Sequence, residues 1–125
     1  MKQFIKIFLA SVLLLIFPVS AASANTAPTT LEYIPGTTDT ILTSPQYITD
    51  IQLEAGEEYT AIILGDSARW DIQKFKDVQN SQWHIYVQPI QKYIESNMLI
   101  ITNHRTYNIH LSSGEFHNSI INWKY

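Results

Sequence analysis

Short apolar runs, each separated from the next by turn residues, dominate this sequence from residue 40 onward and limit what it can fold into. The runs are too short for ordinary helices and are rich in β-branched and aromatic residues, which is typical of strands. The segments of this kind are Thr40–Thr43, Ile48–Leu53, Tyr59–Leu64, Arg69–Ile72, Trp83–Gln88, Met98–Thr102, Thr106–Ser112 and Ile120–Tyr125. Their even spacing predicts an all-β chain that forms a single antiparallel β-sandwich of about eight short strands.

Alternation within the runs predicts which side chains face the core. In the segment Trp83–Gln88, one face carries Trp83, Ile85 and Val87, and the other face carries the polar residue His84. The expected core residues are Ile51, Leu53, Ile85, Val87, Leu99, Ile101, Ile109 and Leu111. Trp70 is expected to pack over the edge of this core.

The connections between the runs carry two further expectations. Gly56 in the turn Ala55–Glu58 predicts a positive φ, and we expect this turn to join Ile48–Leu53 and Tyr59–Leu64 as a hairpin. Only Lys74–Asn80 and Ile90–Ser96 leave room for a helical turn.

The first 24 residues have the features of a secretory signal peptide. Lys2 and Lys6 precede the apolar run Ile7–Phe17, and Ala22-Ser23-Ala24 provides the small-x-small cleavage pattern. We expect cleavage between Ala24 and Asn25, then a flexible leader over residues 25–32 and the sandwich over residues 33–125. An uncleaved membrane anchor is the alternative, although a membrane-spanning helix needs roughly 20 apolar residues.

Composition excludes several classes of protein. The chain has no Cys, which excludes disulfide scaffolds, thiol catalysis and thiolate metal sites. Its net charge is −3, and its eight Lys and Arg residues are scattered along the sequence. A nucleic-acid-binding domain would need a clustered basic face, so we expect no nucleic-acid partner.

Two sets of residues could in principle carry metal or acid–base chemistry. The four histidines, His84, His104, His110 and His117, show no short ligand spacing, so we expect solvated side chains and no metal.

Carboxylates are the second set, with Glu57 and Glu58 adjacent and Asp66 and Asp71 on either side of Trp70. Two carboxyl groups facing a sugar would suit a glycosidase, but an Asp after Gly at a strand end more often accepts backbone N–H groups. Trp70, Trp83 and Trp123 could line a ligand cleft, although core packing is their default role. We therefore expect no enzyme activity and no cofactor.

Ordered motifs follow one another over residues 33–125. They are Tyr33-x-Pro35-Gly36, Thr49-x-Ile51-x-Leu53-x-x-Gly56-Glu57, Gly65-Asp66-x-x-x-Trp70, His84-Ile85-x-Val87-x-Pro89, Asn97-x-Leu99-x-Ile101-Thr102, Arg105-Thr106-Tyr107-x-Ile109-x-Leu111 and Trp123-Lys124-Tyr125. In this order they resemble the N-terminal domain of the TrbG/CagX family, the periplasmic core-complex subunit of type IV secretion and conjugation machines. The positions that carry the resemblance are Gly56, Glu57, Gly65, Asp66, Trp70, Pro89, Leu99, Arg105, Thr106 and Tyr107.

The sequence departs from the family in two places. Family members usually carry two basic residues before Thr-Tyr, whereas the first of them here is His104. In the family, a linker and a second β domain follow, and that domain binds a small lipoprotein. This chain stops at Tyr125, so the resemblance implies only the periplasmic inner-layer half, and a lipoprotein partner is not expected.

The resemblance implies a non-catalytic structural subunit of a type IV secretion core complex in the periplasm. Its implied partners are an inner-membrane-spanning scaffold subunit and a full-length paralogous subunit. We expect the chain to be monomeric alone and ring-forming in the complex. The alternative is a stand-alone secreted β-sandwich that binds a glycan or small ligand through Tyr86, His84 and His110.

Overall fold

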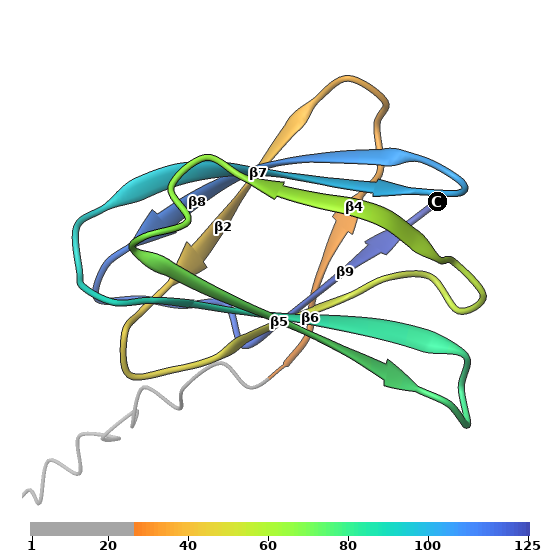
Figure 1. The fold of residues 1–125 in the computed structure, drawn as a ribbon, viewed down its shortest axis with the longest axis horizontal. Helices are drawn as coiled ribbons and strands as arrows, with labels where there is room; N and C mark the ends of the chain where they lie inside the picture. The colour runs from red at the N-terminus through yellow and green to blue at the C-terminus, as the bar shows by residue number, and fades with distance from the viewer. Residues whose placement is uncertain (1–26) are drawn as a thin grey trace, which may run out of the picture.

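The apolar runs form nine strands stacked in two layers in a computed structural model that describes residues 27–125 (Figure 1). The strands are β1 (Thr29–Glu32), β2 (Thr38–Thr43), β3 (Thr49–Gln52), β4 (Tyr59–Leu64), β5 (Trp70–Asp77), β6 (Gln82–Pro89), β7 (Glu95–Thr102), β8 (Thr106–Ser113) and β9 (Ile120–Lys124). No part of residues 27–125 is helical, and these residues include no helix able to cross a membrane. The predicted signal peptide and its cleavage site at Ala24 and Asn25 lie outside the described residues.

The strands form a five-stranded sheet in the order β1-β9-β3-β6-β5 and a four-stranded sheet in the order β2-β8-β7-β4. This confirms the all-β fold, but the expectation of purely antiparallel sheets is wrong. β1 and β3 both pair with β9 in parallel, and β2 pairs with β8 in parallel. The parallel pairs arise because the chain changes sheets at every connection from β1 to β5, so strands return to a sheet by way of the other layer.

The predicted hairpin is also wrong. β3 lies in the five-stranded sheet and β4 in the four-stranded sheet, so the connection between them crosses from one layer to the other. Gly56 does have a positive φ, of 86°, as predicted. The sequence therefore predicted the backbone conformation of the turn. It did not predict which of the two sheets the next strand joins.

Three segments form strands where none was predicted. Thr29–Glu32, expected in the flexible leader, pairs with β9 as β1. Lys74–Asp77 continues β5, and Glu95–Ser96 begins β7, so neither predicted helical turn forms there. β5 is an edge strand with most of its side chains exposed, which hides the alternation that would have identified it.

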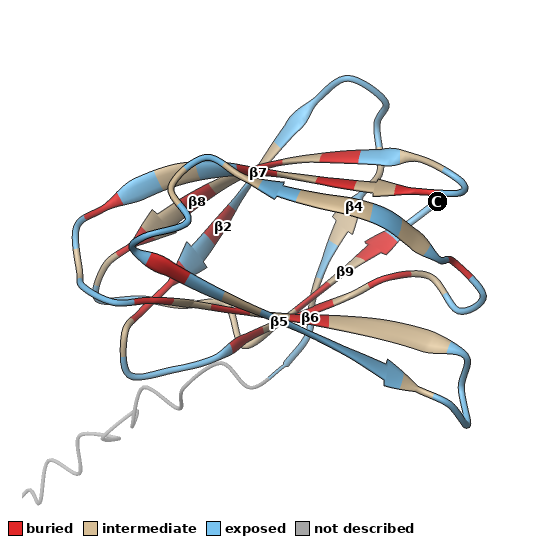
Figure 2. Cartoon of the chain, in the orientation of Figure 1, coloured by how far each residue is buried: buried red, intermediate tan, exposed pale blue. Residues whose placement is uncertain are grey.

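The core lies between the two layers, where the buried positions of the central strands gather (Figure 2). Its buried hydrophobic residues are Ile41, Ile51, Leu53, Trp70, Ile85, Val87, Ile94, Met98, Ile100, Tyr107, Ile109, Leu111, Ile121 and Trp123. Six of the eight predicted core residues are among them. The other two, Leu99 and Ile101, lie half-buried on the outer face of β7, and Met98 and Ile100 are buried instead.

The error at β7 has a simple cause. β7 is paired on both sides, with β4 and β8, and its sequence is apolar at successive positions from Met98 to Ile101. Alternation cannot indicate which face of such a strand points inward.

Candidate functional site

The family-motif residues gather mainly in two regions of the sandwich. Glu57, Arg105 and Tyr107 meet at one end, which we call the closed end and define by these three residues with Thr102 and Tyr125. Figure 1 shows the C-terminus at this end, beside the turn between β7 and β8. The second region lies along the β4 and β5 edges and includes Trp70.

Glu57 is a fully buried carboxylate at the centre of the closed end. Its Oε2 accepts a hydrogen bond from the Tyr107 hydroxyl at 2.8 Å and from Arg105 Nη1 at 3.1 Å. The Thr102 hydroxyl donates to Oε1, and the backbone N–H of Glu54 donates to Oε2 at 3.2 Å. Burial of a carboxylate is costly unless it is paired and hydrogen-bonded, and both conditions are met here.

Arg105 joins the buried carboxylate to the surface. Its Nη1 also donates to Glu54 Oε2 at 2.7 Å, and its guanidinium carbon lies 3.7 Å from the centroid of the Tyr125 ring. Burial alone would lower the pKa of Arg105, but hydrogen bonds to Tyr107 and Glu54 raise it above its ordinary value. The guanidinium is therefore a permanent positive charge in this network.

Tyr107 fixes the other side of Glu57. The residue is 2% exposed, and its ring centroid lies 4.5 Å from that of Trp123. Its hydroxyl also forms a 2.7 Å hydrogen bond with the Tyr125 hydroxyl. Burial raises the pKa of Tyr107, with a further contribution from the bond to Tyr125, so the phenol stays neutral and remains a donor to Glu57.

The closed end ties together parts of the chain that are distant in sequence. Glu57 lies in the connection between β3 and β4, Arg105 in the turn between β7 and β8, and Tyr125 after β9. Thr102 holds the β7–β8 turn, because its hydroxyl oxygen accepts from the backbone N–H groups of His104 and Arg105 at 3.1 Å each. The network therefore connects both sheets to the loop that crosses between them.

His104, at the position where the resemblance led us to expect a second basic residue, contributes little to this network. Its Nδ1 lies 3.8 Å from Glu54 Oε2, and its side chain is 46% exposed. Arg105 alone reaches Glu57, so the buried ion pair needs one basic residue rather than two.

The Gly65 turn, which leads out of β4, packs against the side chains at the start of β7. A Cβ atom at Gly65 would lie 2.3 Å from Asn97 Oδ1, so a larger residue would require the Asn97 side chain to move. Asp66 accepts a hydrogen bond from Arg69 Nε at 2.6 Å, which lowers the pKa of its carboxyl group. Asp66 therefore serves turn chemistry, as expected from its position after Gly.

Trp70 and Pro89 are paired across β5 and β6 beyond this turn. Trp70 is 4% exposed, and its Nε1 has no hydrogen-bond partner among the described residues. It lines an open slot of about 300 Å³ between the edges of β4 and β5, together with Ile62, Leu64, Ser67, Asp71, Ile72 and Lys74.

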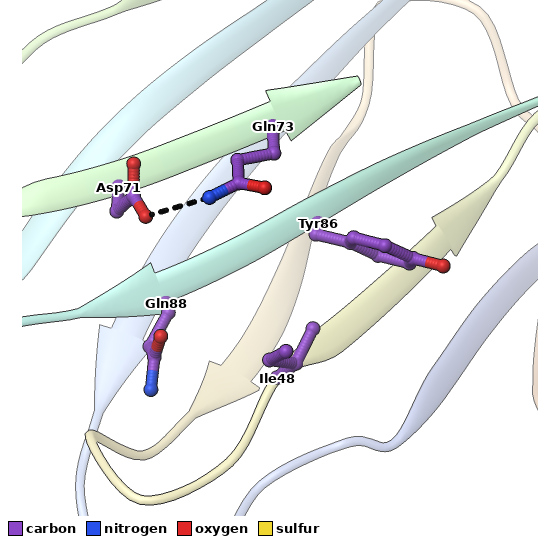
Figure 3. A pocket seen from close by; sticks show the side chains of 5 residues that line it. All are labelled: Ile48, Asp71, Gln73, Tyr86 and Gln88. Atoms are coloured by element: carbon purple, nitrogen blue, oxygen red, sulfur yellow. Dashed lines mark hydrogen bonds between the residues drawn. The ribbon is translucent and has the colours of Figure 1, made fainter. Parts of the chain in front are cut away.

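A second hollow lies on the outer face of the five-stranded sheet (Figure 3). It is lined by Ile48, Asp71, Gln73, Tyr86 and Gln88 and has a volume of about 40 Å³. Ligand pockets usually enclose at least about 300 Å³. The three residues proposed for ligand binding do not share this face, because His84 and Tyr86 lie on β6 whereas His110 lies on β8 of the other sheet.

The histidines do not converge. His84 Nδ1 lies 3.0 Å from Asp50, His110 Nε2 lies 3.6 Å from Glu95, and the His117 ring stacks on Tyr47. Within residues 27–125 no group of three or more His, Asp and Glu is placed to hold a metal ion.

The adjacent carboxylates also diverge. Glu57 points into the closed end, whereas Glu58 accepts hydrogen bonds from Lys76 at 2.7 Å and Trp83 at 2.6 Å on the surface. The three Trp residues do not form a cleft, since Trp70 and Trp123 are buried in the core and Trp83 is half-buried at its rim.

Sequence reasoning missed Thr102 and Tyr125 as members of the closed end. Thr102 is the last residue of β7 and immediately precedes a turn, a position where a hydroxyl often binds the following backbone N–H groups. No comparable local signal exists for Tyr125, because its partners are 18 to 20 residues away or more.

Comparison with known proteins confirms the family that the sequence motifs resemble. Residues 26–125 match the family model CagX, described as a conjugal transfer protein. Over 79 residues, 62% of this chain, the sequence is 30% identical to "Probable conjugal transfer protein TrbG" of Sinorhizobium fredii (strain NBRC 101917 / NGR234). The aligned region spans 29% of that relative's length. The chain belongs to the CagX family of conjugal transfer proteins.

Proposed function

We propose that the chain is a non-catalytic structural subunit of the core complex of a type IV secretion or conjugation machine in the periplasm. The observation that carries this proposal is the match of residues 26–125 to a conjugal transfer family. The signal-peptide features of residues 1–24 support export.

The chemistry of the motif residues supports a structural role. Glu57, Arg105 and Tyr107 are the strongest candidates for acid–base chemistry by type, yet they are engaged with one another. Glu57 is fully buried, so it cannot meet a substrate without disruption of the fold. A rigid β module with its polar groups satisfied internally suits a building block of a larger assembly.

The proposed partners are the other core-complex subunits, namely an inner-membrane-spanning scaffold subunit and a full-length paralogous subunit. Contacts between such modules are often small and polar and hold only in the presence of their neighbours. We expect the isolated chain to be a monomer, or at most a weak dimer, and to join a ring in the complex.

Co-purification from the native membrane fraction tests this proposal. A tagged copy of the chain is expressed in cells with the transfer genes present and in matched cells from which they are deleted. We expect the chain to elute in a large particle with other transfer proteins only in the first strain. Elution as a small species in both strains, with the transfer proteins present, would contradict the proposal.

A further inference from the structure

We propose that β4 and the adjacent slot bind an extended segment of another protein, which adds a strand to the free edge of the four-stranded sheet. The choice of partner, another envelope protein, rests on the proposed structural role. Its argument comes from the edge strand, its two faces and the buried indole of Trp70.

The edges at this side of the sandwich differ in their protection. β4 and β5 are the outer strands of the two sheets on the sides away from β1 and β2. β5 carries Asp71, Lys74, Lys76 and Asp77, the kind of charged residues that discourage edge-to-edge pairing. β4, Tyr59–Leu64, has no charged residue, Pro or Gly along its six residues and is open to strand pairing.

Both faces beside the β4 edge are apolar. On the inner side, Ile62 and Leu64 line the slot with Trp70 and Ile72 across from them. On the outer side, Ile63 is 53% exposed and pairs with Leu99 of β7. Leu99 and Ile101, which sequence alternation wrongly placed in the core, extend this outer apolar surface. A strand added to β4 would therefore meet apolar side chains on both faces.

Trp70 contributes its buried indole ring to the slot. It is 4% exposed and lines the slot with Ile62, Leu64 and Ile72. Its Nε1 is itself buried and has no partner among the described residues. An extended peptide in the slot would therefore pack against the ring, while its carbonyl and N–H groups pair with the free edge of β4.

The charge at one end of the slot narrows the chemistry of the partner. Lys74 lines the slot and forms no salt bridge with the described residues, its Nζ lying 5.1 Å from the centroid of the Tyr59 ring. We infer a segment of about five residues that is apolar at successive positions and ends in an acidic residue near Lys74.

A second copy of this chain fits less well. In such a pair, the partner's Ile62 and Leu64 would already be packed against their own core and could not fill this slot. A second copy would also bring its own charged β5 beside the first. A segment that has no core of its own can present side chains on both faces.

Site-specific photo-crosslinking of the full chain in cells that express the transfer genes tests the inference. A benzoylphenylalanine replaces Ile63 on β4, and a control places it at Thr40, an exposed residue on β2 at the opposite edge of the same sheet. We expect the crosslinks from position 63, mapped by mass spectrometry, to fall on one short segment of a different protein. Position 40 should give no such product.

A matched pair of charge variants sharpens this test. Ala61→Lys places a charge on the outer face of β4, and Thr38→Lys makes a similar change on β2. We expect Ala61→Lys to reduce the position-63 product about tenfold and Thr38→Lys to leave it unchanged. Crosslinks to a second copy, scattered crosslinks, no product, or an equal response to both variants would overturn the inference.

Co-purification in the same cells separates this inference from the proposed function. A chain that co-purifies with the transfer proteins but gives no position-63 product would overturn the strand-addition site alone. A chain that crosslinks to one segment but does not co-purify with the transfer proteins would overturn the proposed role and leave the strand-addition site supported.

Discussion

At the closed end the buried polar atoms are paired with one another, whereas beside the slot the buried Nε1 of Trp70 has no partner within residues 27–125. Glu57 alone accepts from four groups, which come from two stretches of the chain, residue 54 and residues 102–107. The slot, in contrast, is open, is lined by both apolar and polar residues, and lies between two strand edges. Both regions contain residues of the family motifs.

The difference indicates two tasks for the same small domain. A polar network with all its hydrogen bonds formed holds the two sheets in one relative position. Its loss would therefore lower the stability of the whole domain. An open strand edge adds little to the stability of the isolated chain but offers backbone hydrogen-bonding groups to a partner. Variants that remove polar groups should therefore destabilise the fold more at the closed end than at the slot.

Arg105→Met should give the largest effect, because it leaves the Glu57 carboxylate buried without its positive partner. Removal of one member of a buried ion pair costs about 3–5 kcal/mol in free energy of unfolding. Chemical denaturation of the purified domain, residues 25–125, measures this loss. Arg69→Met is the matched control, since Arg69 pairs with Asp66 at the surface, and its midpoint should stay near that of the parent. Equal losses from both variants would show that the closed end is not a buried network.

Trp123→Phe and Trp70→Phe compare a buried indole that packs on Tyr107 of the closed end with the buried indole that lines the slot. Both residues are buried, at 6% and 4% exposed, but Trp123 Nε1 donates to Asp39 at 3.0 Å whereas Trp70 Nε1 has no partner. Both changes lose similar apolar volume, so the difference reports the hydrogen bond. We expect Trp123→Phe to be more destabilising by about 1.5–3 kcal/mol, the range for a bond to a charged group. A Trp70→Phe loss equal to or greater than that of Trp123→Phe would contradict the comparison.

Thr102→Val removes a hydroxyl without much change in shape. Its loss leaves Glu57 one donor short and takes the acceptor from the N–H groups of His104 and Arg105. We expect a destabilisation of about 1–3 kcal/mol, measured by denaturant unfolding. Thr102→Ser should retain most of the stability because it keeps the hydroxyl. Val keeps the methyl group and Ser keeps the hydroxyl, so equal losses from the two variants would contradict a dominant role for the hydroxyl.

Alkaline pH should give the smallest effect. Burial raises the pKa of Tyr107 in the folded chain, whereas an unfolded Tyr ionises near pH 10. The contribution of Tyr107 is therefore constant below about pH 10 and is lost as the pH rises above it, because only the unfolded state ionises. Melting temperatures measured from pH 8 upward should fall less steeply for Tyr107→Phe than for the parent. Parallel curves for the two proteins would contradict a neutral, buried Tyr107.

Local patterns in the sequence predicted much of the fold. The turn residues placed Gly56 at a positive φ, and alternation identified Ile85 and Val87 as core residues. Pairing between strands was not predictable in the same way, because β3 and β4 are neighbours in sequence but belong to different sheets. The sequence did not predict β1, because Thr29–Glu32 becomes a strand by pairing with β9 at the opposite end of the chain.

The candidate site was predicted only as a set of positions. The sequence motifs include Glu57, Arg105 and Tyr107, but their meeting depends on contacts 48 to 50 residues apart. The slot was missed because its lining comes from two edge strands whose side chains are partly exposed and give no clear alternation.

The indole N–H signals of the ¹⁵N-labelled mature chain test the contrast between the two regions most directly. The chain has three Trp residues, so three indole signals are expected. Trp83 Nε1 donates to Glu58 and Trp123 Nε1 donates to Asp39, so Glu58→Gln and Asp39→Asn should each move one signal and thereby assign it. The account predicts that the third signal, from Trp70, lies upfield of the other two, as expected for an indole without a hydrogen bond. A Trp70 signal as far downfield as those of Trp83 and Trp123 would show that its donor is already bound and would contradict the account.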